Sequence, residues 1–385
     1  MERLYFSVDV GGSSTKTFSI FEGKENFKIH NNYVLKHDGY VDTKDFIIDD
    51  NDYATKLDLG ITINSNPKGD FRLSCKKIID EINGNRWLMG DLSKAVSPNA
   101  TKLPLGIKVR HTHYYLNIIS ALVQEMEEKG LTDVNVFLGV LIPARQYFDL
   151  DKEMINEIFS GEINVKNNIT GSTYRINIEE IIIKPEAVVA FNSCFIKDGK
   201  LTELGKDLAD KFNVVIDIGE NTIDIAGIRG GKPDPSTFDS FSYAGALLMQ
   251  YLSKEIYRKF NGYNPTINEL WKAFSTGYLT LGAYDEWIGE EITNANRELA
   301  FKLFNDFTQS YLLGKGIHMP QIASFMFVGG GSTKLDKVTS VGEHFMVFAK
   351  EQSRYTRYVM PDDIRLANIQ GIADIMRLLY VKGTK

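Results

Sequence analysis

Hydrophobic residues form short runs that alternate with longer stretches in which apolar positions recur at helical spacing. The runs Val134–Ile142, Ile181–Ile183 and Ala323–Val328 have the length of buried strands. Pro143 closes the first run and Pro185 follows the second, and proline lacks the N–H donor that a sheet needs. Strands that alternate with helices along a whole chain predict an α/β architecture in which helices cover the sheets.

Helices are predicted between these strands. Thr266 and Glu269 form a capping-box pattern, so a helix should begin directly after Thr266. A polar helical stretch is also expected at residues 198–212. The other main helices are predicted at residues 113–130, 187–195, 245–260, 296–313 and 366–379.

One pattern occurs twice. Residues 5–20 (YFSVDVGGSSTKTFSI) and residues 213–228 (NVVIDIGENTIDIAGI) each contain an apolar strand, an aspartate, a small polar turn and a second strand. Each copy predicts a β-hairpin. The separation of about 200 residues is too long for a solenoid repeat and indicates a duplicated lobe.

The chain length agrees with two lobes, since 385 residues exceed what one hydrophobic core usually organises. The first lobe is predicted at residues 1–190, with an inserted subdomain at about 32–97, and the C-terminal helix at 365–385 returns to it. The second lobe is predicted at residues 191–364, with an inserted helical subdomain at about 234–304.

Composition and charge narrow the class of protein. Hydrophobic residues make up 43% of the chain and charged residues 24%, which is ordinary for a globular protein. A net charge of -6 argues against a protein that coats DNA or RNA, because neutralising phosphates requires a basic face. No direct contact with nucleic acid is therefore expected.

The cysteines and the N-terminal residues indicate the cellular compartment in which the protein is expected. Cys75 and Cys194 lie far apart without metal-ligand spacing, which favours structural roles in a reducing compartment. A strand pattern begins close to Met1 and leaves no room for a signal peptide, and no apolar run approaches the roughly 18 to 20 residues of a membrane span. We expect a cytoplasmic protein without membrane contact.

The first hairpin carries residues suited to binding phosphate. Glycines let backbone N–H groups approach phosphate oxygens, hydroxyls add donors, and a lysine adds positive charge. Asp9 would hold magnesium, through its water ligands. The structural alternative is a tight turn, in which Asp, Gly and Ser are favoured anyway. The candidate residues are Asp9, Gly11, Gly12, Ser13, Ser14 and Lys16.

The second hairpin repeats the carboxylate and the small polar turn. Two such hairpins would grip a polyphosphate from both sides, with Asp9 and Asp217 flanking the metal. Asp224 is read as a strand residue that faces solvent. The candidate residues of this hairpin are Asp217, Gly219, Glu220, Asn221 and Thr222.

A glycine run directly after the strand Ala323–Val328 is the third candidate element. Glycines permit close backbone approach, so a nucleoside base and ribose would lie against this loop. The alternative is a flexible strand-to-helix turn, and the run fits neither a Walker loop nor a GxGxxG motif. The residues are Gly329, Gly330, Gly331 and Ser332.

In this order the three elements resemble the phosphate 1, phosphate 2 and adenosine motifs of the actin, sugar kinase and heat-shock chaperone superfamily, over nearly the whole chain. The sequence VVIDIGENTIDIAGI and the spacing from Asp9 to Lys16 are most similar to ParM- and Alp-type plasmid-segregation actins. The resemblance implies a two-lobed actin-like fold, made of duplicated ribonuclease-H-like domains around a nucleotide cleft. It also implies ATP or ADP with Mg²⁺ as cofactors, ATP hydrolysis, self-association into filaments and a DNA-binding adaptor protein as partner.

The resemblance also assigns a catalytic candidate. Residues 185–190 resemble the family's first connecting segment, in which an acidic or amide side chain orients the water that attacks the γ-phosphate, so Glu186 joins Asp9 and Asp217 as predicted catalytic residues. The alternative for Glu186 is a glutamate that stabilises a helix N-terminus. Residues 367–372 resemble the second connecting segment, whose small residues allow helices to cross closely.

Two points stay open at the level of sequence. Glu220 and Asn221 stand where ParM-type proteins usually carry a glycine and a small polar residue, although asparagine tolerates positive φ and the turn can still form. A small-molecule kinase of the same superfamily and a non-polymerising nucleotide-binding scaffold are the alternative functions. A kinase would require an acceptor motif near the cleft, and the sequence contains no convincing one.

Overall fold

The computed structural model describes residues 2–12, 14–37, 56–104, 106–149, 151–197 and 200–383. The candidate residue Ser13 and residues 38–55 of the predicted first insertion lie outside the described residues. The chain divides into two compact units. Unit 1 comprises Met1–Glu186 and Ile369–Lys385, and unit 2 comprises Ala187–Asn368.

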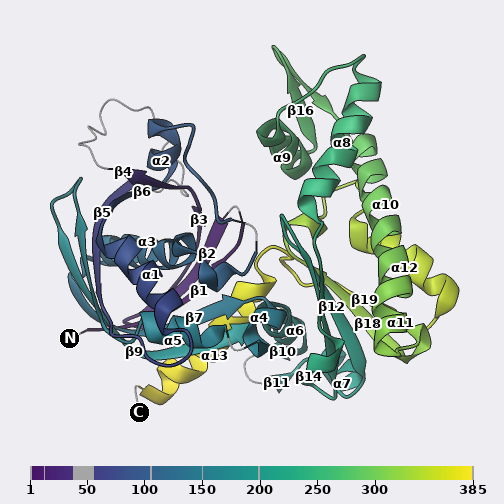
Figure 1. The fold of residues 1–385 in the computed structure, drawn as a ribbon. Helices are drawn as coiled ribbons and strands as arrows, with labels where there is room; N and C mark the ends of the chain where they lie inside the picture. The colour runs from purple at the N-terminus through teal and green to yellow at the C-terminus, as the bar shows by residue number, and fades with distance from the viewer. Residues whose placement is uncertain are drawn as a thin grey trace. The chain divides into compact units, whose positions relative to one another are not determined.

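Unit 1 is built on one nine-stranded sheet, which curls around helices α1 and α3 (Figure 1). The strand order is β3-β2-β1-β7-β9-β8-β5-β6-β4. β1, β7 and β9 run parallel in the middle of the sheet, and β2 pairs antiparallel with β1. Strands β4, β5 and β6, which come from the predicted insertion at 32–97, belong to this same sheet. The strands are β1 (Glu2–Val10), β2 (Ser14–Phe21), β3 (Lys24–Asn31), β4 (Val34–His37), β5 (Lys56–Asn64), β6 (Arg86–Gly90), β7 (Asp133–Ile142), β8 (Glu162–Asn167) and β9 (Thr173–Pro185).

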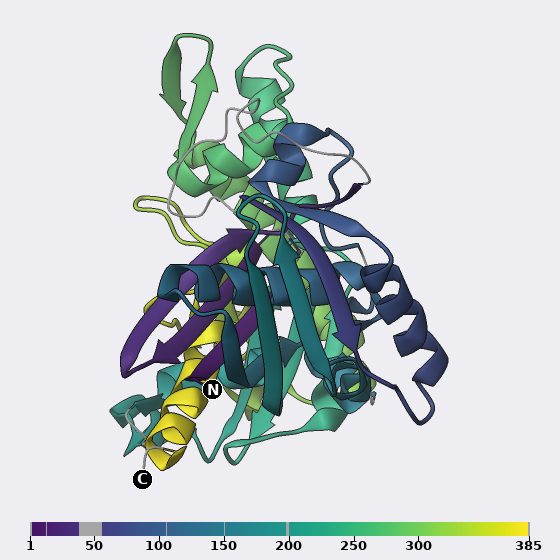
Figure 2. The ribbon, with the colours of Figure 1, turned by 90° about the vertical axis from the view of Figure 1, so that its left-hand side faces the viewer.

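Two helices cover opposite faces of the central strands of unit 1. The alternation of side chains along β1 sends Leu4, Phe6 and Val8 into the core with α3 (Thr112–Lys129), which ends at Gly130 in the left-handed conformation. Tyr5 points to the other face and meets Tyr380 of the C-terminal helix α13 (Ala367–Gly383), which lies near the N-terminus in Figure 2. The remaining α-helices of unit 1 are α1 (Arg72–Asn83), α2 (Asp91–Val96), α4 (Ala144–Phe148) and α5 (Lys152–Ile158). α6 (Glu186–Phe195) begins at the last residue before the unit boundary and continues in unit 2.

Unit 2 repeats the central topology of unit 1. Its sheet has the order β14-β13-β12-β18-β19, with β15 also paired to β13. β12 and β13 form an antiparallel hairpin, and β12, β18 and β19 are parallel, as are β1, β7 and β9. The duplication predicted from the two hairpins is thereby confirmed. The strands are β12 (Phe212–Ile218), β13 (Ile223–Arg229), β14 (Lys232–Pro233), β15 (Asp239–Phe241), β18 (Ile322–Val328) and β19 (Arg357–Val359), and a separate small pair is β10 (Ile196–Lys197) with β11 (Lys200–Leu201).

Long helices connect the strands of unit 2. α8 (Gly245–Lys259) and α10 (Gly289–Asp306) pack side by side and frame a small region with α9 (Ile267–Thr276) and the hairpin of β16 (Tyr278–Leu281) and β17 (Tyr284–Trp287) (Figure 1). The capping box of Thr266 and Glu269 is present as predicted. The other helices are α7 (Glu203–Leu208), α11 (Leu313–Lys315) and α12 (Val341–Gln352).

Three elements differ clearly from the predicted ones. The helix predicted at 296–313 begins earlier, at Gly289, where Glu290 and Glu291 stabilise the first turn, and it continues through a π-helical segment to Gly316. Of the stretch predicted helical at 198–212, the described part contains only the short helix α7. The strand predicted at 181–183 is the end of the 13-residue strand β9. Among the described residues, no helix is long and apolar enough to span a membrane.

Candidate nucleotide-binding site

The first hairpin closes with a four-residue turn that requires glycine. The Gly11 N–H donates to the Ser14 carbonyl at 2.9 Å. A Cβ atom at Gly11 would lie 2.9 Å from that same oxygen, closer than real Cβ contacts, so any other residue would open the turn. Gly12 lies in the same turn, which leaves a short stretch of backbone without bulky side chains at the end of β1.

Asp9 and Lys16 face each other across this hairpin, each one residue away from the turn. The Lys16 Nζ lies 3.5 Å from Asp9 Oδ2, and the side chains are 16% and 5% exposed, respectively. A carboxylate and an ammonium group thus flank the turn while each compensates the other's charge. The phosphate-binding role of Lys16 stays a prediction, and in the structure its ammonium group pairs with Asp9.

The side-chain amide of Asn32 makes two hydrogen bonds to the residues of this hairpin. The sequence analysis did not identify Asn32 as part of the site. Its amide nitrogen donates to the Gly11 carbonyl at 2.6 Å, and its amide oxygen accepts from the Thr15 hydroxyl at 2.5 Å. Asn32 is completely buried. A buried amide with both ends bonded to the turn fixes the turn's conformation, because either end would be expensive to leave unsatisfied.

Buried polar side chains form a row at every second position of β2, at Thr15, Thr17 and Ser19. Thr17 Oγ1 lies 3.2 Å from His30 Nε2, and His30 Nδ1 lies 2.8 Å from Gln124 Oε1. Burial lowers the pKa of His30 to about 4, and the nearby Lys28 ammonium acts in the same direction. His30 is therefore neutral near pH 7.

Glu125 ends this row. It accepts a hydrogen bond from the Ser19 hydroxyl and pairs with Lys28 and Lys129 at 3.1 and 2.9 Å. Burial opposes ionisation, but the hydroxyl and the two ammonium groups outweigh it, so the pKa of Glu125 is lowered. The ionised Glu125 of α3 is therefore bonded to Ser19 of β2 and to Lys28 of β3.

Glu186 lies at the same edge of the sheet as Asp9. β7 stands between β1 and β9, with Asp9 opposite Leu141 and Pro185 opposite Ile142, and Glu186 follows Pro185 directly. Because these strands are parallel, both carboxylates come at their carboxyl ends. Ligand sites in open α/β sheets form at this kind of edge.

Lys108 is the partner of Glu186 and is the second residue that the sequence analysis missed. The Lys108 Nζ lies 2.7 Å from Glu186 Oε1, and the Glu186 side chain is 8% exposed. Burial raises the pKa of Tyr114 well above its usual value, and the charges of Glu186 and Asp9 contribute, which places both carboxylates near one buried phenol. Glu186 is thus a buried carboxylate held in an ion pair, and the helix-end alternative alone does not account for that pair.

The second hairpin closes in the same way as the first. The Gly219 N–H donates to the Thr222 carbonyl at 3.0 Å, and a Cβ at Gly219 would lie 3.2 Å from that oxygen. The carbonyls of Gly219 and Glu220 accept from the N–H groups of Gly245 and Ala246, at 3.1 and 2.9 Å. The N-terminus of α8 therefore holds this turn, which still forms with Glu220 and Asn221 in it.

The Asp217 side chain lies close to Asn368 and Gly329, which come from two other segments of unit 2. Asn368 Nδ2 donates to Asp217 Oδ2 at 2.8 Å. Gly329 has φ +88°, and a Cβ there would lie 2.3 Å from Asp217 Oδ1, so only glycine fits beside this carboxylate. Asp224, opposite Asp217 on β13, accepts from the Thr222 hydroxyl at 3.0 Å instead of only facing solvent.

The glycine loop after β18 packs onto the second hairpin. A Cβ at Gly331 would lie 2.4 Å from Ile218 Cγ2, whereas a Cβ at Gly330 would meet no atom within 4 Å. Gly330 therefore offers open backbone for a ligand. Ser332 is buried, and its hydroxyl donates to the Val328 carbonyl at 2.8 Å. This hydroxyl therefore joins the loop to the end of β18.

The donor set fits a magnesium ion that keeps most of its waters. Mg²⁺ is usually bound through one or two carboxylates together with substrate phosphates and water. Asp9 in unit 1 and Asp217 in unit 2 each offer a carboxylate of this kind, and Asn368 Oδ1, buried beside Asp217, lacks a hydrogen-bond partner and could accept from a metal-bound water. Within the described ranges, no group of three or more His, Cys, Asp or Glu side chains could hold a metal directly.

The chain is similar in fold to solved structures of actin-like proteins. The actin-like protein Alp7A is 17% identical to this chain with a TM-score of 0.71, over 99% of this chain and 98% of that one. The archaeal actin homolog Ta0583 is 18% identical with a TM-score of 0.68, over 98% and 99% of the two chains. ParM from Clostridium botulinum, solved as a 15-stranded filament, is 14% identical with a TM-score of 0.63, over 98% and 100%.

These likenesses define the fold of the chain as actin-like, as the order of its motifs predicts. Ta0583 has also been solved in complex with ADP, at 18% identity and a TM-score of 0.65, over 98% of this chain and 100% of that one. No protein-family model and no curated protein sequence matches the chain.

Proposed function

We propose that this protein is an ATP-hydrolysing actin-like protein that assembles into filaments. The observation that carries the proposal is the repeated turn. Each unit has a glycine-closed hairpin, with a buried aspartate two residues before the glycine, at the carboxyl end of a parallel strand. Two such turns in one chain fit one nucleotide bound through its phosphates by groups from both hairpins.

Each residue of the proposed site has its own role in phosphoryl transfer. Lys16 and the backbone N–H groups of the turns bind phosphate oxygens, and the open backbone at Gly330 contacts the nucleoside. Asp9 and Asp217 would hold Mg²⁺ through its water ligands, and the ion would neutralise charge on the phosphates. Glu186, held by Lys108, orients the attacking water and accepts its proton on the carboxylate. Positioning of this kind is most of what phosphoryl transfer to water requires.

Self-association and an adaptor complete the proposal. The filament form solved for Clostridium botulinum ParM supports assembly on this fold. The net charge of -6 offers no obvious way to bind a DNA backbone directly, so a separate DNA-binding adaptor would link filaments to plasmid DNA in the cytoplasm. Tight, salt-sensitive binding of DNA by this chain alone would contradict the adaptor role.

Phosphate release and sedimentation test the proposal together. The protein with ATP and Mg²⁺ alone should release phosphate, and pelleting should rise with ATP or a slowly hydrolysed analogue and fall after hydrolysis. A protein that stays monomeric with every nucleotide, and turns over only when a small-molecule acceptor is added, would instead be a kinase of this fold.

A further inference from the structure

The side chain of Trp271 lies against the second hairpin turn of unit 2. A Cβ atom at Gly245 would lie 2.6 Å from Trp271 Cη2 and 3.1 Å from the Gly219 carbonyl oxygen, so the edge of the indole and this carbonyl lie close to the same point. The Gly245 N–H, at the start of α8, donates to that carbonyl at 3.1 Å. α9, which carries Trp271, packs against α8 (Figure 1). A large aromatic ring is thus the neighbour of the candidate phosphate-binding turn.

The sequence of α9 fixes the position of this ring. The capping box of Thr266 and Glu269 sets the residue at which the helix begins. Leu270 and Phe274 are buried and anchor the helix in the core of unit 2. The rings of Trp271 and Phe274 meet edge to face, with their centroids 6.1 Å apart. The ring of Trp271 is therefore held beside the turn by its own helix.

The indole of Trp271 is only partly buried, and its N–H has no partner in the part of the chain that the structure describes. The indole N–H of a buried tryptophan usually finds an acceptor. Trp87, which is buried in unit 1, follows this rule, since its Nε1 donates to the Ile82 carbonyl at 3.3 Å. The Nε1 atom of Trp271 instead stays open to solvent. Part of this ring is therefore available to another molecule.

The glycine loop after β18 lies next to the same turn. A Cβ atom at Gly331 would lie 2.4 Å from Ile218 Cγ2, and Ile218 directly precedes Gly219. The loop and Trp271 thus both contact the segment Ile218–Gly219 and its immediate neighbours. A nucleoside is joined to its phosphates, so phosphates bound at the turn would bring the base near these two elements. A base is a planar aromatic ring, and every base has a face on which an aromatic side chain can stack.

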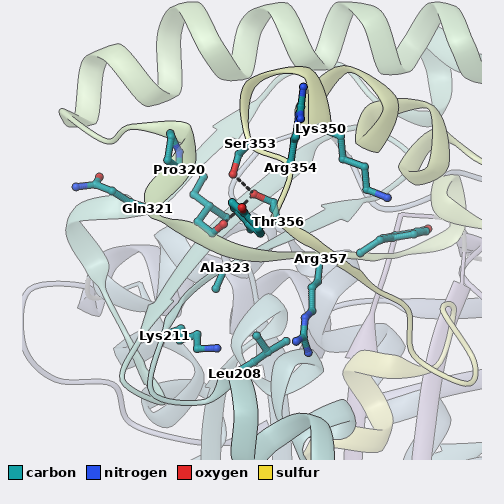
Figure 3. A pocket seen from close by; sticks show the side chains of 13 residues that line it. Leu208, Lys211, Pro320, Gln321, Ala323, Lys350, Ser353, Arg354, Thr356 and Arg357 are labelled. Atoms are coloured by element: carbon teal, nitrogen blue, oxygen red, sulfur yellow. Dashed lines mark hydrogen bonds between the residues drawn. The ribbon is translucent and has the colours of Figure 1, made fainter.

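A cavity of about 910 Å³ in unit 2 does not offer the same opportunity (Figure 3). Its lining includes Ile322 and Ala323, the first residues of β18, whereas Gly219 follows the last residue of β12. β12 and β18 are parallel, with Asp217 opposite Val328, so the length of β18 separates this cavity from the turn. That length is about 20 Å, at roughly 3.3 Å per residue. A nucleoside joined to phosphates at the turn would not reach this cavity.

We propose that Trp271 forms one wall of the nucleoside site and stacks on the base of the bound nucleotide. The inference rests on the proposed function, in which the second turn binds phosphates of ATP. It adds a contact that lies outside the three glycine-containing motifs. The contact recognises the aromatic base and leaves the phosphates to the turn, so it distinguishes a nucleotide from a polyphosphate without a base.

Binding of ATP and of inorganic tripolyphosphate tests this contact. Trp271→Leu removes the aromatic ring, so the affinity for a slowly hydrolysed ATP analogue with Mg²⁺ should fall by about 5- to 150-fold, as expected for the loss of one base–aromatic stack. Trp271→Phe keeps an aromatic face and should lose less than about fivefold. Tripolyphosphate engages the phosphate-binding groups alone. Its affinity, measured by competition against the ATP analogue, should change by no more than about twofold in both variants.

Trp287→Leu is the matched control in the same small region of unit 2. The Trp287 ring packs on Gly277 and Gly289, where Cβ atoms would lie 2.1 Å and 2.5 Å from ring carbons. It therefore occupies the hairpin side of this region and not the start of α8. The affinity of this variant for the ATP analogue should stay within about twofold of wild type.

Tryptophan fluorescence gives a second measurement. The chain contains three tryptophans, so single replacements can assign a change in emission to one of them. Stacking on a base should quench the emission of Trp271. The ATP analogue should therefore lower the emission of wild type and of Trp287→Phe but not that of Trp271→Phe, and tripolyphosphate should lower none of them.

The outcomes separate the stacking contact from the proposed function. Wild-type affinity for the ATP analogue in Trp271→Leu, or an equal loss of affinity for the analogue and for tripolyphosphate, would overturn the contact and leave the ATPase standing. An analogue that binds wild type without lowering its emission, or that lowers the emission of Trp271→Phe equally, would also overturn the contact. A wild-type chain that binds no nucleotide would overturn the proposed function, and the contact with it.

Discussion

The two hairpins close with the same turn but bury different side chains behind it. On β2 the buried polar side chains after the first turn are Thr15, Thr17 and Ser19, and they bond to Asn32, His30 and Glu125. The matching positions on β13 are Ile223, Ile225 and Gly227. The first turn is thus held by directional hydrogen bonds, and the second by packing, the N-terminus of α8 and the Asn368 contact to Asp217.

The charges beside the two aspartates differ as well. Asp9 stands opposite a lysine, whereas Asp217 stands opposite Asp224. Glu186 follows β9 directly in unit 1, and Met360 follows β19 at the corresponding place in unit 2. In the proposed function, unit 1 would supply the lysine that binds phosphate and the catalytic carboxylate, and unit 2 would supply a second carboxylate and the loop that contacts the nucleoside.

The largest effect is expected from Glu186→Gln. The amide keeps the size of the side chain but cannot accept a proton from water, so ATP turnover should fall by about 10²- to 10⁴-fold while ATP binding is retained. Phosphate release under saturating ATP measures this. Met360→Gln is the matched change in unit 2 and should leave turnover within a factor of about two. Equal losses in both variants would contradict the assignment of catalysis to unit 1.

The buried histidine should make unit 1 sensitive to acid. The folded pKa of His30, about 4, lies below the usual value near 6.5, so the unfolded chain binds more protons between these values. The free energy of unfolding should therefore fall as the pH drops from about 6.5 to about 4, by about 3 kcal/mol in total from this group.

Urea unfolding at several pH values measures this dependence. His30→Gln should remove most of it, and His111→Gln controls for the loss of a histidine elsewhere in unit 1. Lys28 and Glu125 face the same row and remain in both variants. An unchanged pH dependence in His30→Gln would show that His30 titrates normally.

Lys16→Met tests the difference in charge between the hairpins. Loss of one charge-assisted bond to phosphate should weaken ATP binding by about 10- to 100-fold, whereas Asp224→Asn, at the matching position of the second hairpin, should change it by no more than about threefold. Calorimetric titration with a slowly hydrolysed ATP analogue measures both. A larger loss in Asp224→Asn would reverse the roles given to the hairpins.

Asn32→Asp should give the smallest effect and the most specific one. A carboxylate can still accept from Thr15 but repels the Gly11 carbonyl, so ATP affinity at neutral pH should fall by about tenfold. Protonation at lower pH restores a donor, so the affinity relative to wild type should recover there. A loss that is the same at every pH would indicate general damage to the fold. Ile223→Val, on β13, provides a control without this pH dependence.

The local elements of the site could be predicted from the sequence, and its long-range contacts could not. Both hairpins, the glycine loop and the start of α6 at Glu186 follow from patterns within a few residues, and the structure has them in those places. Asn32, Lys108 and Asn368 contact residues that are 21, 78 and 151 positions away. Nothing in the nearby sequence marks Asn32 or Lys108, since an asparagine or a lysine is ordinary at a strand or helix end. Asn368 lies in the segment that resembles the second connecting segment, but that resemblance does not predict its contact with Asp217.

Calorimetry on the two aspartates tests the central claim that groups from both hairpins bind one nucleotide. Titration of wild type with a slowly hydrolysed ATP analogue and Mg²⁺ should give one site per chain. Asp9→Asn and Asp217→Asn should each weaken that single site in the presence of Mg²⁺, and should differ less from wild type when Mg²⁺ is removed. Two independent sites per chain, or wild-type affinity in either variant with Mg²⁺ present, would contradict the account.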